Sequence, residues 1–452
     1  MEGTDDTARV VRGSFGSRDE ARGLAQQSAR RLIAGHDPRG TAARRVQRRC
    51  QRRLEPGKRQ VGAIRALDDQ PTGADLDFGP RASGAQAHAH HHGGGDDGNQ
   101  GASAYHACVD PDALRALPKA ELHQHLDGSV RPETAVELAA EIGLPLSLDD
   151  ARGRMVGPMR CRDQAQLLGF FDLPIALLQT REALERATSE LVEDLAADGV
   201  RYAEIRWAPR LHLERGLDVE AVIEAVTNGV ARTAAVRGPD TPLIGLIVTG
   251  MRSHPPAANA ELARTAGAFG RPVIGFDLAG PEADWPAPPH AIAFVTAREA
   301  GLALTAHAGE VAGAQRVREV LDFGVRRVAH GVSAAADEAV LDLLRGRDVT
   351  LDLCPTSNVQ AGIVDHVSHH PLAALHRAGV SVTISTDDRT VTGTSLTDEM
   401  ARCATELALT RDELAAIALN GFDRAFAPVA VMAVLRADAV RAWDAWRTAA
   451  IS

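Results

Sequence analysis

The chain has 452 residues, of which 44% are hydrophobic and only 4% aromatic, and it carries a formal net charge of −10. This length allows a large core built mainly from Ala, Val, Leu and Ile, and the acidic balance argues against a general nucleic-acid binder. Five scattered cysteines without a Cys-x-x-Cys pair indicate neither a disulfide framework nor a thiolate zinc site, and the lack of a secretory signal or a long apolar run predicts a cytoplasmic protein.

Residues 1–110 differ in composition from the rest of the chain. They contain an arginine-dense run at 44–59 and a His-Gly-Asp tract at 88–98, and few apolar residues recur at regular spacing. Such a segment cannot bury enough apolar surface to offset the entropy of ordering. We therefore expect a disordered, low-complexity extension. The alternative is that the segment is not translated because the start codon lies near residue 110.

From residue 111 onward, short apolar runs rich in β-formers alternate with helical patterns. This alternation predicts parallel strands joined by crossover helices. Eight such runs are present, and eight parallel strands with helices between them make a (β/α)8 TIM barrel, an α/β fold that we assign to residues 111–452. The expected strands are residues 120–125, 200–207, 243–249, 273–278, 302–307, 326–330, 349–354 and 380–386.

Helical periodicity is clear between most of these strands and after the last one. The stretch 126–199, between the first two strands, is long and includes an apolar piece at 167–174. We interpret this insertion as a lid over the catalytic face, as extra helix packed on the barrel, or as both. The expected helices are residues 182–198, 218–236, 289–300, 315–323, 337–345, 370–378, 398–406, 412–420 and 437–450.

Polar residues gather where the expected strands end. His123 and His125 alternate along the first strand and therefore face the same side, and Asp127 follows as the strand ends. Neutral histidine nitrogens and carboxylate oxygens are typical zinc ligands, although an isolated His-x-His is more often not a metal site. The carboxyl ends of barrel strands meet at one rim, where barrel enzymes carry their chemistry. Titratable groups follow six strands, at HQHLD (123–127), FDLAG (276–280), HAGE (307–310), AHG (329–331), CPTSN (354–358) and STDD (385–388).

Three further features of the strands have structural interpretations. Glu204 and Arg206 alternate on one face of the second strand, so we expect a structural ion pair between them inside the barrel. Cys354 is expected to be a small buried hydrophobic residue. Ser357 and Asn358 are assigned to a tight turn after the seventh strand.

Six ordered motifs resemble those of the adenosine deaminase family of metal-dependent amidohydrolases. The matching pieces are LPKAELHQHLDGS, FDLAGPE, TAHAGE, VAHG, LDLCPTSN and STDD, and the similarity extends over roughly residues 116–406. The resemblance implies one zinc ion per subunit, held by His123, His125, His307 and Asp387.

The resemblance also implies roles for residues around the metal. Glu310 would be the catalytic proton donor, and His330 would orient and help to activate the attacking water. The implied substrate-binding residues are His125, Asp127, Gly280 and Asp388, with Asp127 at the ribose and with Asp388 and the backbone of Gly280 at the purine ring.

These residue types fit hydrolytic deamination of adenosine, and of 2′-deoxyadenosine, to inosine and ammonia. Zinc lowers the pKa of water from 15.7 toward ~7, which makes hydroxide available to attack C6 of the purine. A carboxylic acid must protonate N1 as charge develops, and Glu310 lies three residues beyond a ligand. His330 and Asp387 flank the water, and one of them takes its proton. The expected partner is a small purine nucleoside, with no nucleic acid and no membrane, while the sequence indicates no oligomeric state.

Two alternative functions remain open. The first keeps the fold and chemistry but changes the substrate to adenine or to a nucleoside modified at the 5′ position, such as aminodeoxyfutalosine. Asp127 favours adenosine, because related deaminases of other substrates often have Glu or Asn there, whereas Pro281 departs from the acidic residue that is usual after Gly280. The second alternative is a non-catalytic binding barrel, against which the intact ligand set and Glu310 argue.

Overall fold

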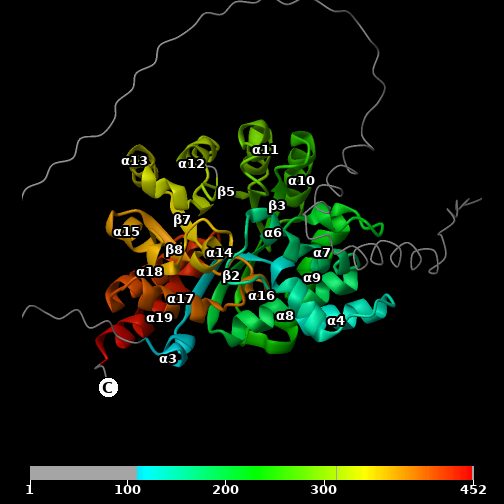
Figure 1. Ribbon diagram of the computed structural model, residues 1–452, viewed down its shortest axis with the longest axis horizontal. Coiled ribbons are helices and arrows are strands. Elements are labelled where there is room, and N and C mark those ends of the chain that lie inside the picture. The colour runs from blue at the N-terminus through cyan, green and yellow to red at the C-terminus, as the bar shows by residue number, and fades with distance from the viewer. Residues whose placement is uncertain (1–108, 312, 450–452) are drawn as a thin grey trace, which may run out of the picture. The chain divides into compact units, whose positions relative to one another are not determined.

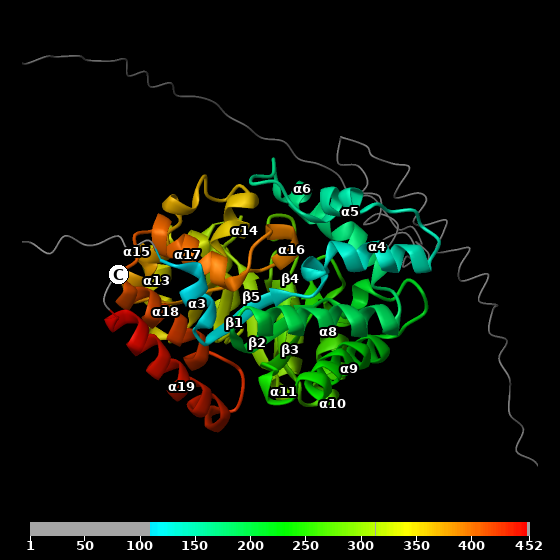
Figure 2. The same cartoon turned by 90° about the horizontal axis from the view of Figure 1, so that it is seen from below.

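The computed structural model describes residues 109–311 and 313–449, so the predictions made for residues 1–108 lie outside the described residues. Eight parallel strands form a barrel in which each strand pairs with the next along the chain. Figures 1 and 2 show the helices arranged around these strands, and the predicted (β/α)8 fold is confirmed. The strands are β1 (Lys119–His125), β2 (Val200–Trp207), β3 (Leu243–Met251), β4 (Val273–Ala279), β5 (Ala303–Ala308), β6 (Arg327–His330), β7 (Thr350–Leu353) and β8 (Ser381–Ile384).

The barrel closes between β8 and β1. Gln124 of β1 bridges in parallel to Asp387, which lies just beyond β8. The N–H of His125 donates to the carbonyl of Asp387 at 2.7 Å, and the N–H of Asp387 donates to the carbonyl of His123 at 2.9 Å. These closing hydrogen bonds place Asp387 beside two histidines that alternate along β1.

Helices connect successive strands and extend the barrel at both ends of the described chain. Four of them, α4 to α7, form the insertion after β1. The helices are α3 (Pro111–Ala116), α4 (Pro132–Glu141), α5 (Leu148–Met155), α6 (Gln164–Leu168), α7 (Asp172–Leu177), α8 (Arg181–Ala197), α9 (Val219–Arg237), α10 (Pro256–Phe269), α11 (Ala291–Glu299), α12 (Ala314–Leu321), α13 (Glu338–Gly346), α14 (Pro355–Gln360), α15 (Leu372–Arg377), α16 (Arg389–Thr392), α17 (Leu396–Glu406), α18 (Arg411–Asp423) and α19 (Val429–Thr448).

Helix α8 shows how local sequence forms a crossover helix. The side chain of Thr180 accepts a hydrogen bond from the N–H of Ala183, which satisfies one of the free amides at the helix start. Leu184, Leu191 and Leu195 recur at helical spacing and are buried on one face. That face packs against α9 and β2, so the helix is fixed to the barrel wall by apolar contact.

The predicted strands are all present, with bounds that differ by at most two residues. Helix α10 was missed, because its alanine-rich sequence gives little contrast between a buried and an exposed face. The prediction for the last helix was wrong at its start. Helix α19 begins at Val429 rather than at 437, and the exposed Val429 and Val434, at 85% and 64%, hide its periodicity.

The predicted ion pair between Glu204 and Arg206 is wrong. Although the two side chains lie on the same face of β2, each contacts charged side chains of other strands. Glu204 pairs with Arg327, whose Nε also lies 2.8 Å from Asp352. Arg206 lies 3.4 Å from Asp277. All these side chains are fully buried, so paired charges occupy part of the barrel interior.

The part of the insertion around α6 packs on loops at the rim through a small apolar cluster separate from the main core. Cys161 and Leu167 contribute from the insertion, and Ala361 and Val391 contribute from the chain that follows β7 and β8. The N–H of Cys161 donates to the carbonyl of Gln360 at 2.8 Å. The part of the insertion around α6 therefore lies on the loops after these two strands, whereas Leu138, Met155 and Leu173 anchor the rest of the insertion in the main core.

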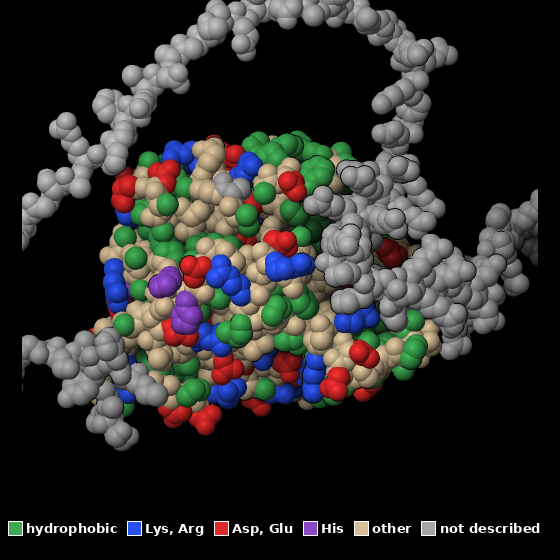
Figure 3. Space-filling model, viewed as in Figure 1, with side chains coloured by type: hydrophobic (Ala, Val, Ile, Leu, Met, Phe, Trp, Pro, Cys, Tyr) green, Lys and Arg blue, Asp and Glu red, His purple; other side chains and the backbone are tan. Residues whose placement is uncertain are grey.

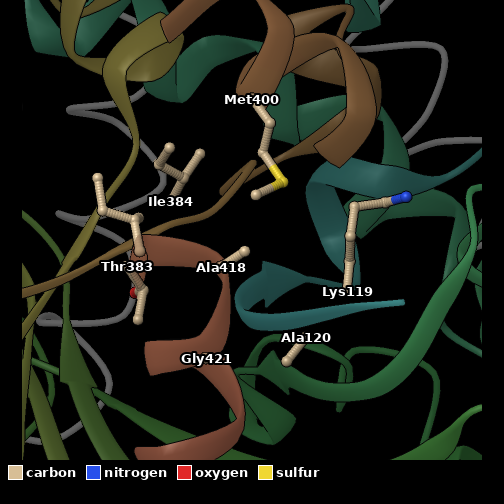
Figure 4. Close-up of a pocket in the computed structure, with 8 residues that line it drawn as sticks. Lys119, Ala120, Thr383, Ile384, Met400, Ala418 and Gly421 are labelled. Atoms are coloured by element: carbon tan, nitrogen blue, oxygen red, sulfur yellow. The ribbon is translucent and has the colours of Figure 1, made fainter. Parts of the chain in front are cut away.

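A cavity of about 10 Å³ lies between the barrel wall and helices α17 and α18 (Figure 4). Its volume admits about one water molecule, and its lining includes none of His123, His125, His307 and Asp387. An added Cβ on Gly421 of α18 would lie 3.0 Å from the Cβ of Ala120, so α18 approaches β1 closely. At the same place burial lowers the pKa of Lys119 to about 8, and its Nζ donates to the carbonyl of Leu114 at 2.8 Å. The cavity is a packing feature of the wall.

The described surface and helices give two observations about partners. Basic and acidic side chains are interspersed on the face drawn in Figure 3, which offers no patch of one sign. Among residues 109–311 and 313–449, no helix is both long and apolar enough to cross a bilayer.

Candidate active site

Four side chains from three strands converge at the rim of the barrel. Their ligand atoms all lie within 4.8 Å of one another. The Nε2 atoms of His123 and His125 are 3.3 Å apart, and those of His125 and His307 are 3.2 Å apart. Oδ1 of Asp387 lies 3.1 Å from Nε2 of His123. Three imidazole nitrogens and one carboxylate aimed at a single point form a donor set suited to a divalent metal ion.

Two histidines of this cluster, His123 and His125, are held in the neutral form. Burial lowers the pKa of His125 to about 4 and keeps the pKa of His123 well below its usual value. Both rings are therefore neutral near pH 7, and a neutral imidazole offers a lone pair to a cation.

Buried side chains outside the four-residue cluster hydrogen-bond to its members and fix their orientation. The carboxylate of Asp277 lies 3.0 Å from Nδ1 of His307. A carboxylate only accepts, so Nδ1 carries the proton and Nε2 turns its lone pair toward the cluster. The hydroxyl of Ser357 donates to Oδ2 of Asp387 at 2.7 Å. Each of these contacts fixes the direction of one ligand.

Two site residues have a left-handed backbone. His330 has φ of 65° and Asp387 has φ of 64°. This region is costly for residues with a Cβ, and such residues concentrate at functional sites. The two side chains meet at the rim, with Nε2 of His330 lying 3.8 Å from Oδ2 of Asp387.

Glu310 is positioned by the loop after β4 and by the insertion. The side chain of Glu282 accepts hydrogen bonds from the N–H groups of Gly309 and Val311, on either side of Glu310. Nε2 of Gln164, at the start of α6, donates to Oε2 of Glu310 at 3.0 Å. The insertion thus contacts the predicted proton donor directly.

The environment of Glu310 favours its protonated form. Burial, together with the nearby charges of Asp387 and Glu282, raises the pKa of Glu310 to about 8. A carboxyl group with this pKa holds its proton at neutral pH, so Glu310 can act as an acid there.

Two more acidic residues lie buried at the same rim. Asp127 is 5% exposed, and its Oδ1 lies 2.9 Å from Nε2 of His212, without the alignment of a regular hydrogen bond. Oδ1 of Asp388 is buried with no hydrogen-bond partner among the described residues. Burial and the charge of Asp387 raise the pKa of Asp388 well above its usual value. An added Cβ on Gly128 would lie 1.9 Å from Oδ1 of Asp388, so glycine is required beside it.

Gly280 follows β4 with φ of +106°, a conformation that favours glycine. An added Cβ there would lie 3.3 Å from Cε of Met251. The predicted residue is therefore at the carboxyl end of β4, with its backbone in a conformation that other residues rarely adopt.

The sequence interpretation missed several residues that support the site. Ser357 and Asn358 were assigned only to a turn, but they lie in the short helix α14, and Asn358 contacts Nδ1 of His330 at 3.1 Å. Cys354 is fully buried, as expected. Asp277 lies within a quoted motif, yet its role depends on a contact between strands. Gln164 and His212 had no motif that could have identified them.

Comparison with known proteins gives a consistent family. The sequence model of the family described as Adenosine deaminase matches residues 118–442. A protein named adenosine deaminase from Mycobacterium ulcerans (strain Agy99) is 38% identical over 334 residues, covering 70% of this chain and 92% of the relative. One from Enterococcus faecalis (strain ATCC 700802 / V583) is 36% identical over 316 residues, covering 69% of this chain and 93% of the relative.

Solved structures share the fold and belong to deaminases and an amidohydrolase. An adenine deaminase from Arthrobacter aurescens is 30% identical with a TM-score of 0.68, covering 74% of this chain and all of that chain. An amidohydrolase from Burkholderia ambifaria with bound Zn is 25% identical with a TM-score of 0.68, covering 77% of this chain and 94% of that chain. An N6-methyl-AMP deaminase from Arabidopsis thaliana is 27% identical with a TM-score of 0.65, covering 74% of this chain and 98% of that chain.

The family match spans the strands and rim loops that bring the ligand cluster and Glu310 together. The relatives are covered almost completely, so the whole catalytic unit is represented in this chain. With its fold, its rim and its relatives in agreement, the chain belongs to the adenosine deaminase family and is an aminohydrolase of purines.

Proposed function

We propose that this chain hydrolyses adenosine, and also 2′-deoxyadenosine, to inosine and ammonia with one zinc ion per subunit. The relatives named adenosine deaminase, at 36% to 38% identity and 92% to 93% coverage of their length, support this substrate. The observation that carries the proposal is the position of Glu310, whose pKa of about 8 makes it an acid, close to a cluster suited to a metal ion.

Zinc fits the donor set of His123, His125, His307 and Asp387, which offers three imidazole nitrogens and a carboxylate. When bound, zinc would supply Lewis-acid chemistry that makes hydroxide available at neutral pH. The outer contacts of His307 with Asp277, and of Asp387 with Ser357, would hold the ligands in place.

Glu310 would deliver its proton to N1 of the purine as the oxygen of water adds to C6. Loss of ammonia from C6 then gives the 6-oxo product, so that one water is consumed for each ammonia released. The hydrogen bond from Gln164 engages Oε2 of Glu310 and leaves the other oxygen for the purine. Glu282 keeps the loop around Glu310 in position.

Asp388 and Gly280 would contact the purine ring. The carboxyl of Asp388 is buried, has a raised pKa and lacks a partner for Oδ1 among the described residues, so it can donate a hydrogen bond to a ring nitrogen. The backbone of Gly280, free of a side chain, allows a flat ligand to come close. His125 would line the substrate side of the ligand cluster.

Asp127 would accept a hydrogen bond from a ribose hydroxyl and thereby distinguish a nucleoside from a free base. The alternative substrate, adenine, is favoured by the adenine deaminase structure at 30% identity. The two substrates differ only in the ribose, so the role of Asp127 decides between them.

Ammonia release from a panel of substrates tests this proposal. The panel comprises adenosine, 2′-deoxyadenosine, adenine, AMP, N6-methyl-AMP and aminodeoxyfutalosine, with kcat/KM measured for each. We expect adenosine and 2′-deoxyadenosine to have the highest values. A highest value for adenine or for a nucleotide would replace the proposed substrate.

The variant Asp127→Ala tests the ribose contact. Losing a hydrogen bond to a charged group costs about 1.5–3 kcal/mol, so kcat/KM for adenosine should fall about ten- to a hundredfold, with a much smaller change for any activity on adenine. Asp149→Ala, an exposed aspartate in α5, is the matched control and should leave both values unchanged. Equal losses for both substrates would mean that Asp127 supports the rim and not the ribose.

A further inference from the structure

A chain of buried hydrogen bonds runs behind His330. It joins His330 at the end of β6, Asn358 in α14 and His370 just before α15. Nδ1 of His330 lies 3.1 Å from Nδ2 of Asn358, and Oδ1 of Asn358 lies 3.1 Å from Nε2 of His370. The three residues are 1%, 0% and 4% exposed, so water does not compete for these contacts.

One backbone amide fixes which groups donate and which accept along this chain of hydrogen bonds. The N–H of Leu372 donates to Nδ1 of His370 at 3.2 Å. A backbone N–H can only donate, so Nδ1 of His370 is an acceptor and carries no proton. Burial lowers the pKa of His370 to about 3, so the ring is neutral and its one proton is on Nε2.

The orientation of Asn358 follows from this proton. Nε2–H of His370 must donate to an acceptor, which is the carbonyl oxygen of the Asn358 amide. The amide nitrogen of Asn358 therefore faces His330 and donates to its Nδ1. An Nδ1 that accepts is unprotonated, so the proton of the neutral His330 ring is on Nε2, the nitrogen that faces the rim.

We propose that Asn358 and His370 are positioning residues that hold His330 as its Nε2–H tautomer, so that His330 presents a hydrogen-bond donor to the reacting water. This inference rests on the proposed deaminase function for its catalytic meaning, but the tautomer follows from the hydrogen bonds alone.

The tautomer divides the roles of the two groups that flank the water. Nε2–H of His330 lies 3.8 Å from Oδ2 of Asp387, so a donor and an acceptor face the same space. A water or hydroxide between them would direct a proton to Asp387 and a lone pair to His330. A fixed donor at this place stabilises negative charge on the oxygen as it attacks the purine. In this arrangement Asp387, and not His330, accepts the proton of the water.

The tautomer of His330 can be read directly from the zinc-loaded wild-type protein. Two-bond ¹H–¹⁵N correlation spectra distinguish Nε2–H from Nδ1–H histidines, and His330→Asn identifies the signals of this ring. We expect the Nε2–H pattern. An Nδ1–H pattern or a doubly protonated ring would overturn the proposal, even if every variant below failed to fold.

Substitution at Asn358 should reverse the tautomer. In Asn358→Asp the carboxylate cannot donate to Nδ1 and must accept from it, so His330 should change to the Nδ1–H form. Outer partners of metal-site residues typically contribute about 10–100-fold to activity, so kcat for adenosine should fall at least about tenfold with little change in KM. An Nε2–H pattern with normal kcat in a folded, zinc-loaded Asn358→Asp protein would contradict the proposal.

Substitution at His370 tests the end of the hydrogen-bond chain that is farther from the rim. His370→Phe removes the donor that orients Asn358, so kcat should fall about tenfold or more at unchanged zinc content, while His370→Gln supplies an amide donor and should restore part of the loss. His369→Phe, at the adjacent exposed histidine, is the matched control. Equal kcat for His370→Phe and the control would exclude a positioning role for His370. If the wild type shows the Nε2–H pattern but releases no ammonia from adenosine, the proposed function fails and the tautomer assignment stands.

Discussion

Glu310 follows the proposed ligand His307 by three residues, and its carboxyl accepts a hydrogen bond from Gln164 in the insertion. Its surroundings explain why a carboxyl at this rim keeps a proton at neutral pH, since Asp387 and Glu282 place negative charge nearby and the protein shields the group from water. An acid that is already protonated when the purine binds can transfer its proton as C6 is attacked.

The variant Glu310→Gln should retain zinc and lose most turnover. Glutamine is nearly isosteric but cannot give a proton to N1, and a positioned acid contributes about 10²–10⁴-fold, so kcat should fall by this factor. The measurement is kcat for ammonia release together with zinc content. Glu338→Gln, at an exposed residue of α13 that pairs with Arg345, is the control and should be unaffected. Near-normal kcat with full zinc would remove Glu310 from the acid role, and loss of zinc would make it a ligand or a support of the fold.

The pH dependence of activity should depend on Gln164. Glu310 is active when protonated, so kcat/KM should fall as pH rises through about 8. The hydrogen bond from Gln164 lowers the pKa of Glu310, so Gln164→Leu should move this alkaline limb to higher pH. Gln166→Leu, on the same short helix but bonded to Arg162, controls for disturbance of the insertion. An unmoved limb, or one moved to lower pH, would show that this bond does not tune the acid.

That His123, His125, His307 and Asp387 lie together could be predicted because their types and spacing carry information by themselves. His123 and His125 alternate along a strand, and strand ends of a barrel share one rim. His212 and Gln164 could not be predicted in this way. Each acts through one contact with a residue far away in the chain, and a glutamine or histidine in a loop has many alternative roles. Such partners become visible only when the loops are placed in space.

At the scale of elements, strands were easier to predict than helices. Several buried strands are apolar runs bounded by turns, which gives a sharp signal in β3 and β4. Helix α10 lacks such a signal because its alanine-rich sequence gives little contrast in hydropathy between a buried and an exposed face. The insertion was expected to be a lid, a packed helix, or both. The structure shows packed helices whose first residue in α6 contacts Glu310.

The apolar cluster under the insertion should determine how often this element opens. Leu167 is 7% exposed in this cluster, and removing most of its side chain should reduce the free energy of local opening by about 2 kcal/mol. In Leu167→Ala, hydrogen exchange of the Cys161 amide should therefore accelerate about thirtyfold by local opening, with exchange in the barrel strands unchanged. Leu168→Ala, at a neighbour that is 37% exposed, should leave exchange nearly unchanged. Acceleration throughout the barrel would mean that the insertion and the core open together.

At the scale of the whole molecule, the order of strands around the barrel brings the site together. The clustered residues from β1, from β5 and from just beyond β8 are far apart in sequence, and the hydrogen bonds that close the barrel place Asp387 beside His123 and His125. The fold and the clustering of these four residues could therefore be predicted from the alternation of strands and helices and from the residues at the strand ends. The substrate could not, because adenosine and adenine share the same reacting atoms and differ only where they touch the rim.

The dependence of adenosine deamination on zinc tests the proposal most directly. Ammonia release from adenosine should be measured for the purified full chain, after removal of metal by a chelator, and after return of zinc in increasing amounts. We predict that activity is lost with the metal and returns in proportion to zinc until about one ion per chain is bound, because one donor set is formed by His123, His125, His307 and Asp387. Full activity without bound metal, or no ammonia from adenosine in the zinc-loaded chain, would contradict the account.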